Sequence, residues 1–120
     1  MLPAANRLRA AADFQETTRR GIKVPRGSVI VYLAPTSQDV EPRVGVVVSK
    51  VVGGSVQRHR AARRIRGAVG PLVSSLPRGA WVVVRALPGA DRSPLLAQDV
   101  ADGVSKAVEL ADRRQPRVTG

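Results

Sequence analysis

The sequence predicts a single-domain α+β sandwich whose elements follow the order helix, strand, strand, helix, strand, helix. Runs of β-branched residues alternate with segments whose apolar residues recur every three or four positions, and Gly and Pro separate these segments. The 120 residues and the 43% hydrophobic content suit one core of ordinary size. We therefore expect one domain over residues 1–114 and a disordered tail over residues 115–120.

The segment over residues 10–20 has the charge order of a short helix. Its acidic residues, Asp13 and Glu16, come early and two arginines come last, an order that complements the helix dipole. Gly21 follows the arginines directly and should end the helix.

Three runs rich in β-branched residues predict the strands. They cover residues 29–34, residues 43–50 and residues 81–87. A polar loop with two prolines separates the first two runs, so we expect these two strands to pair with each other. The third run, WVVVRAL, is almost wholly apolar and should be a largely buried strand.

A basic helix is expected over residues 55–69. Ser55 can cap its start, and Gly70 followed by a proline should stop it. At roughly 100° per residue, the apolar side chains share one side and most basic ones share the other. Because this helix contains no glutamate for i,i+4 pairing, its basic side suits a polyanion better than water alone. That side carries His59, Arg60, Arg63, Arg64 and Arg66.

The start of this helix is a second feature of interest. Arg58 falls within the apolar stripe but in the first turn, where it can extend toward the loop formed by Gly53 and Gly54. Backbone N–H groups of that loop and of Ser55 could bind a phosphate, although glycine before a helix is also routine turn chemistry. Lys50 next to the loop makes a phosphate or metal-hydrate cradle the more specific interpretation.

The last helix is expected to follow Ser93, since Ser followed by Pro is typical of a cap and a first helical position. Apolar residues then recur at helical spacing from Leu96 to Ala111 and should face the core. The acidic residues left to face outward are Asp99, Asp102 and Glu109.

The charge is distributed unevenly along the chain. The stretch from Pro42 to Ala90 contains nine basic residues and no carboxylate, so the formal charge of +11 divides into +9 there and +2 elsewhere. Such a concentration makes a polyanion the expected partner, and nucleic acid the leading polyanion.

Several function classes are disfavoured by what the sequence lacks. There is no cysteine, which excludes disulfides, thiolate metal sites and cysteine nucleophiles. The acid-free stretch offers no carboxylates for magnesium, so protein-based nuclease catalysis is not expected, and neither catalytic nor metal-binding residues are predicted. His59 is the single histidine, and we favour a hydrogen-bonding role over a general base. Without a long apolar segment, a cytoplasmic protein is expected and a membrane partner is not.

The segment RVGVVVSKVVGGSVQRHRAARRIR resembles the signature of the bacterial ribonuclease P protein family. NRLRAAADFQETTRRG resembles the start of these proteins and LPRGAWVVVRALPGA their last strand, so the resemblance covers nearly the whole chain. The family's basic motif falls on residues 58–63, with His59 in place of asparagine and Ala62 in place of a common lysine.

The resemblance implies a left-handed βαβ crossover, as in the ribonuclease P protein and ribosomal protein S five domain two-like fold. It also implies a protein that assists a catalytic RNA in removing the 5′ leader of precursor tRNA, with Mg²⁺ held mainly by RNA and none bound tightly by the protein. One protein per catalytic RNA is expected. Catalytic-RNA binding would fall on Lys50, Gly53, Gly54, Ser55, Arg58, His59, Arg60, Arg63, Arg64 and Arg66. Leader binding would fall on Arg7, Phe14, Tyr32, Val46 and Ser49.

Alternatives remain open at this point. Phe14 and Tyr32 could stack on leader bases or simply fill the core, and Trp81 is expected in the core. A ribosomal or other structural RNA-binding protein would share the basic stretch without stimulating processing. A DNA-binding helix-turn-helix fits poorly, because the segment before residues 55–69 is β-rich rather than helical.

Overall fold

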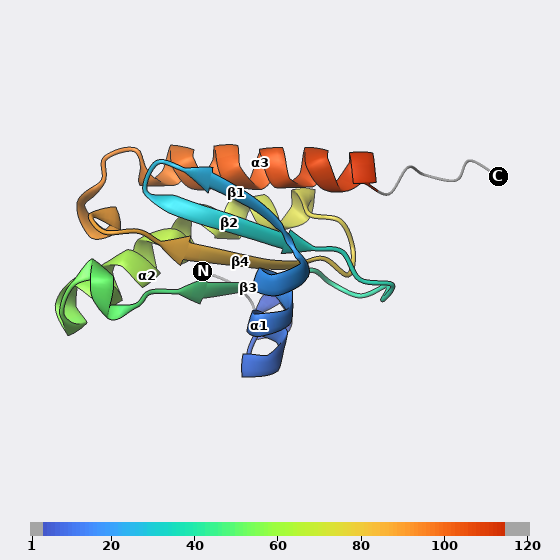
Figure 1. The fold of residues 1–120 in the computed structure, drawn as a ribbon, viewed down its shortest axis with the longest axis horizontal. Helices are drawn as coiled ribbons and strands as arrows, with labels where there is room; N and C mark the ends of the chain where they lie inside the picture. The colour runs from blue at the N-terminus through green and yellow to red at the C-terminus, as the bar shows by residue number, and fades with distance from the viewer. Residues whose placement is uncertain (1–3, 115–120) are drawn as a thin grey trace.

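The computed structural model describes residues 4–114, which form one mixed α+β domain (Figure 1). The helices are α1 (Ala11–Arg20), α2 (Ser55–Val69) and α3 (Leu96–Arg114), and the strands are β1 (Ile22–Arg26), β2 (Val29–Ala34), β3 (Arg43–Val47) and β4 (Trp81–Ala86). Short 3-10 helices are η1 (Ala4–Asn6), η2 (Lys50–Val52), η3 (Gly70–Ser75) and η4 (Ala90–Arg92). The tail expected over residues 115–120 lies outside the described residues.

The four strands form one sheet in the order β1-β2-β4-β3. The predicted pairing of β2 with β3 is therefore wrong, because β4 lies between them, antiparallel to β2 and parallel to β3. The sequence pattern also failed to predict β1, which pairs with β2 through a tight turn at Gly27, whose φ is +50°. Its Pro25 is tolerated because β1 is an edge strand and needs fewer backbone donors.

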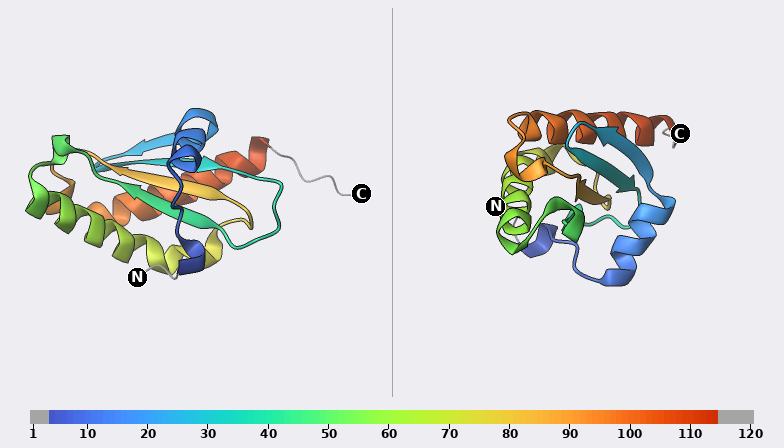
Figure 2. Two further views of the ribbon diagram at one scale, coloured as in Figure 1. Left: turned by 90° about the horizontal axis from the view of Figure 1, so that it is seen from below. Right: turned by 60° about the vertical axis from the view of Figure 1, so that its left-hand side comes forward.

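The layers follow from the alternation of side chains along the strands. Val29, Val31 and Leu33 of β2 are completely buried, and they lie on the sheet face that α2 and α3 cover. These two helices pack against each other, and α1 lies on the opposite face (Figure 2). Because α2 connects two parallel neighbours, β3 and β4, the connection is a crossover; its left-handed sense stays a prediction from the family resemblance.

The helix ends agree with the sequence pattern in most places. Residues 55–69 form α2 as predicted, but Gly54 rather than Ser55 occupies the cap position, and no side chain caps this end. The chain does not leave the helical region at Gly70, where φ is −47° and ψ is −54°, and it continues into η3. Before α3, the Ser93 hydroxyl accepts a hydrogen bond from the Leu95 N–H at 3.3 Å.

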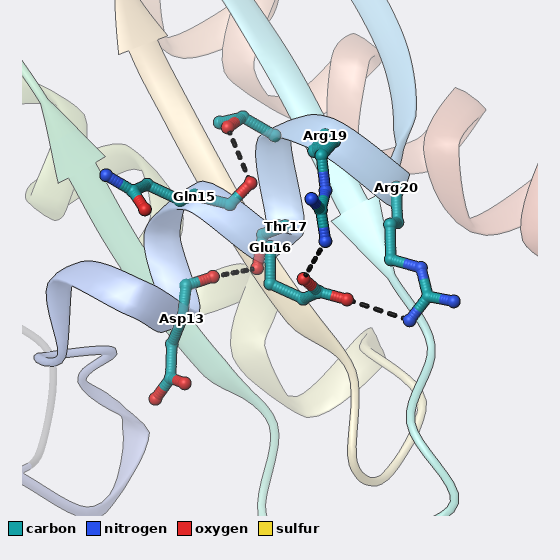
Figure 3. Close-up of polar contacts among 7 residues, drawn as sticks. Asp13, Gln15, Glu16, Thr17, Arg19 and Arg20 are labelled. Atoms are coloured by element: carbon teal, nitrogen blue, oxygen red, sulfur yellow. Dashed lines mark hydrogen bonds and ion pairs between the residues drawn. The ribbon is translucent and has the colours of Figure 1, made fainter.

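The acidic residues with hydrogen-bond partners include Glu16 of α1 and Asp99 of α3. Within α1, Glu16 accepts hydrogen bonds from Arg19 at 2.9 Å and from Arg20 at 2.8 Å (Figure 3), as its predicted charge order favours. In α3, Asp99 was expected to face outward, but its Oδ2 accepts bonds from the N–H and the hydroxyl of Ser28 at 2.9 and 2.7 Å. This contact fastens the turn between β1 and β2 to the first turn of α3.

Candidate nucleic-acid interface

The outer side of α2 is a cationic surface held in place by a buried stripe. Ala61, Ile65 and Val69 are almost fully buried, and they fix the rotation of the helix on the sheet. Arg60, Arg63 and Arg66 are exposed, together with His59. Within the part of the chain that the structure describes, no hydrogen bond or ion pair engages these three guanidinium groups, so their donors are available to phosphates.

Two shallow hollows lie along this side of α2. One, of about 450 Å³, is lined by Ser55, Val56, His59, Arg60 and Arg63. The other, of about 600 Å³, is lined by Arg7, His59, Arg63, Arg66 and Gly67. His59 and Arg63 border both hollows, and the second hollow joins α2 to the N-terminal segment. Arg7, which the family resemblance assigns to leader binding, lies beside the basic helix in this second hollow.

Arg64 differs from the other arginines of α2. Its guanidinium is half-buried and donates hydrogen bonds to the carbonyls of Ala90 at 3.3 Å, Asp91 at 3.0 Å and Ser93 at 2.7 Å. Its donors are directed at the backbone around η4, so Arg64 fastens α2 to the connection between β4 and α3. Among the predicted catalytic-RNA contacts within residues 4–114, Arg64 is the one whose side-chain donors are engaged in hydrogen bonds within the fold.

The first turn of α2 contains a half-buried Arg58, as its place in the apolar stripe predicts. Its Nε is buried without a hydrogen-bond partner among the described residues, and so is Oδ2 of Asp91 in η4. Gly53 has a φ of +146°, and a Cβ there would lie 2.9 Å from Cβ of Gln57. The tight loop leaves Lys50, Gly54 and Ser55 exposed at the start of the helix, where the first N–H groups lack intrahelical acceptors.

The aromatic residues Phe14, Tyr32 and Trp81 gather on the sheet face opposite α2 and α3. Tyr32 is only 7% exposed and clusters with Leu8 and Val83, while Phe14 packs on this cluster and against Gly45. Tyr32 therefore serves mainly as core, and its ring face is not open to a base. Trp81, expected in the core, is half-buried at the edge of the same cluster.

Two other predicted leader residues lie apart from this cluster. Val46 packs against the core beneath α2, because it alternates in step with Val44 and faces away from Phe14. Val46 thus lies on the sheet face opposite Phe14, and its role in leader binding stays a prediction from the family resemblance. Ser49 is exposed between β3 and η2.

Arg85 is a surface residue to which the sequence analysis gave no role. It lies in β4 opposite Ile30 of β2 and Val47 of β3, on the face that carries Tyr32. Its guanidinium carbon is 6.0 Å from the centre of the Tyr32 ring, within cation–π range. The alternation in WVVVRA could have revealed it, because Val82, Val84 and Ala86 take the buried positions and leave Arg85 on the other face.

Arg78 belongs to the acid-free stretch of the sequence, but in the structure it contacts carboxylates from outside that stretch. Its Nε donates to Oδ1 of Asp39 at 2.5 Å, and its Nη1 lies 3.6 Å from Oε1 of Glu41. The hydrogen bond with Asp39, together with the attraction of both carboxylates, raises the pKa of Arg78 above its ordinary value. Its charge is compensated by two carboxylates that precede the stretch, whereas Arg60, Arg63 and Arg66 of α2 have no such partner among the described residues.

Over residues 4–114, no three His, Cys, Asp or Glu side chains gather in a way that could hold a metal ion. None of the helices in that range has the length and apolar character required to cross a bilayer. The fold and its cationic helix thus define a small mixed α+β protein whose basic surface suits a polyanion such as nucleic acid.

Comparison with known proteins narrows this class. The ribonuclease P family model matches residues 2–108. The ribonuclease P protein component of Mycobacterium bovis is 42% identical over 113 residues, covering 92% of this chain and 97% of that protein. The one from Rhodococcus opacus is 49% identical over 96 residues, covering 75% and 77%. The chain belongs to the ribonuclease P protein family.

Solved structures agree with the fold. The RNase P protein from Staphylococcus aureus superposes with a TM-score of 0.67 at 28% identity, covering 91% of this chain and 93% of that one. The RNase P protein from Thermotoga maritima gives a TM-score of 0.71 over 83% of this chain and 96% of that one. At 20% identity, the second likeness concerns the fold alone.

Proposed function

We propose that this chain is the protein component of ribonuclease P and assists removal of the 5′ leader from precursor tRNA. The observation that carries the proposal is the exposed face of α2, where Arg60, Arg63 and Arg66 have no partner among the described residues. In a protein of this family, such a face is suited to the phosphates of the large catalytic RNA.

The outer side of α2 and the sheet face beside Phe14 bind different RNAs in this proposal. The side of α2 with its two hollows, together with the loop at Gly53 and Gly54, binds the catalytic RNA. The sheet face beside Phe14 binds the single-stranded leader, since an unpaired strand can lie across a sheet that offers apolar and cationic side chains. Arg64 acts on the first surface indirectly, by fixing α2 to η4.

Catalysis is assigned to the RNA subunit. Hydrolysis of a phosphodiester by metal ions needs ligands that hold Mg²⁺, and RNA phosphates supply them in the complex. One protein would serve each catalytic RNA in the cytoplasm, where precursor tRNA is made.

The test is reconstitution. The purified protein is mixed with bacterial ribonuclease P RNA and a precursor tRNA at a Mg²⁺ concentration too low for the RNA alone, and leader release is followed. We expect cleavage only when both components are present. A triple variant, R60A with R63A and R66A, should lose the stimulation, whereas R113A on α3 should keep it, since Arg113 already pairs with Glu109 at 2.7 Å.

The alternative is a structural RNA-binding protein. RNA binding without any stimulation of cleavage, tested with the catalytic RNA of a close relative, would favour it and contradict the proposal. Stimulation that survives the triple substitution would keep the function but move the RNA contact away from α2.

A further inference from the structure

We propose that Arg85 forms a stacking site for one unpaired base of single-stranded RNA on the open part of the sheet. The inference rests on the proposed function, because the leader is the single strand expected on this face. It adds a residue that the family resemblance did not assign, and it names the contact that this residue makes.

The register of the sheet creates a flat row around Arg85. Ile30 of β2, Arg85 of β4 and Val47 of β3 are direct neighbours across three strands. Ile30 and Val47 are half-buried and Arg85 is exposed. In the next row, by contrast, Val83 and Gly45 are buried, with Leu8 and Phe14 packed in the same region. The row of Arg85 is thus less covered than the row of Val83 beside it.

Tyr32 holds the guanidinium near the sheet. The distance of 6.0 Å between Cζ of Arg85 and the Tyr32 ring centre is favourable for cation–π attraction. Because Tyr32 is itself 7% exposed, the aromatic ring supports the arginine from below and is not available to a base. The stacking surface offered to RNA is therefore the guanidinium, which is planar and weakly hydrated.

The hydrogen-bonding groups of Arg85 are also available. Among the described residues, no hydrogen bond or ion pair engages its guanidinium, in contrast to Arg64 and Arg78. Lys23, in register with Tyr32 on the edge strand, adds a second exposed cation to this face. A nucleotide stacked on the guanidinium would have its base above the row of Ile30, Arg85 and Val47 and its phosphate near these two cations.

This chemistry selects a single strand. In a duplex the base faces are covered by their neighbours, so a guanidinium can reach only phosphates and groove edges. An unpaired base has an open face, and stacking on a planar side chain tolerates any sequence. Arg85 should accordingly favour unpaired RNA and show little preference among leader sequences.

The experiment compares wild type, R85A, R85K and the control R113A in the holoenzyme with catalytic RNA. Binding is measured to a precursor tRNA, to the mature tRNA and to precursors in which one leader nucleotide at a time is abasic. We expect R85A to weaken precursor binding about 5- to 150-fold, the range for removal of one base-stacking interaction. Mature tRNA should bind equally well to every variant.

The decisive measurement is whether the effect of an abasic leader position on binding depends on Arg85. For wild type, one abasic position should weaken binding, and R85A should be insensitive to that same position. R85K keeps the positive charge but lacks the planar guanidinium. It should therefore show the salt dependence of wild-type binding but no loss of binding at the abasic position. Circular dichroism of R85A should match wild type, because the side chain is exposed.

Two results would overturn the inference in distinguishable ways. If wild type prefers precursor over mature tRNA and R85A shows the same preference and the same abasic pattern, Arg85 is not the stacking site while the proposed function stands. If wild type shows neither leader-dependent binding nor stimulation of cleavage, the proposed function fails and the stacking site fails with it.

Discussion

The ring of Phe14 in α1 lies directly against the backbone of Gly45 in β3, so closely that a Cβ at Gly45 would collide with ring carbons Cε1 and Cζ. Gly45 thereby sets how near α1 approaches the sheet. Since Leu8 and Tyr32 belong to the same cluster, this contact also shapes the edge of the open face on which Arg85 lies.

Replacing Gly45 by alanine should displace Phe14 and destabilise the protein by about 1–3 kcal/mol, the usual cost of overpacking. The measurement is urea unfolding. Adding F14A to G45A should cost less than the sum of the two single changes, since the collision disappears. G67A is the matched control, because a Cβ at Gly67 in α2 meets nothing within 4 Å, and it should leave stability unchanged or slightly raised. Additive effects of G45A and F14A would contradict this account.

Arg64 should matter for stability more than any other arginine of α2. R64A removes the side-chain donor of three carbonyls around η4, and those of Ala90 and Ser93 keep only a backbone N–H at 3.4 Å. The free energy of unfolding should therefore fall by about 1–3 kcal/mol. R66A removes an exposed side chain that has no hydrogen bond within the described residues and should change stability by less than about 0.5 kcal/mol. Equal melting temperatures for the two variants would show that the bonds to η4 contribute nothing.

The elements best predicted from sequence are those whose signals are local. Residues 55–69 were identified because glycines flank a segment with helical spacing, and that spacing also placed Arg60 and Arg63 on the exposed side. β1 was missed because it has only five residues and contains Pro25. The pairing of β2 with β3 failed for another reason: chain order does not reveal that β4 inserts between them.

For the site residues too, local features were predictable from the sequence and long-range contacts were not. The partners of Arg64 lie 26 to 29 residues further along the chain, so the sequence around Arg64 does not predict them. The burial of Tyr32 depends on Leu8, which reaches the sheet through the N-terminal segment. For Val46, strand alternation with Val44 already predicts its place on the core-facing side of β3.

The cluster of Glu16 with Arg19 and Arg20 predicts a pH-dependent contribution to stability. The hydrogen bond from Arg20 is the main cause that lowers the pKa of Glu16 below its ordinary value of 4.5, with Arg19 adding to it against the opposing effect of desolvation. A carboxylate whose pKa is lowered on folding stabilises the protein above its unfolded pKa, and this contribution is lost as pH falls through the folded pKa.

Thermal melts of wild type and E16Q should therefore differ slightly at neutral pH, with wild type the more stable. The difference should shrink as the pH falls below 4.5 and vanish in stronger acid. High salt at neutral pH should reduce it as well, because both arginines are exposed. A difference that is constant from neutral to acid pH would show that the glutamine disturbs the helix by another route.

Arg60 and Arg78 lie in the same acid-free stretch but should respond differently to salt. Arg60 is exposed on α2 and has no partner among the described residues, whereas Arg78 is bound to Asp39 and close to Glu41. A cation that neutralises an RNA phosphate releases about one counterion, so R60A should reduce the slope of log K against log salt by about one for each phosphate that Arg60 neutralises. R78A should leave this slope unchanged, because its charge is already compensated within the protein. The measurement is a titration of the catalytic RNA over a range of KCl concentrations. If R60A and R78A changed the slope of log K against log salt equally, ion pairing within the fold would not decide which arginines contact RNA.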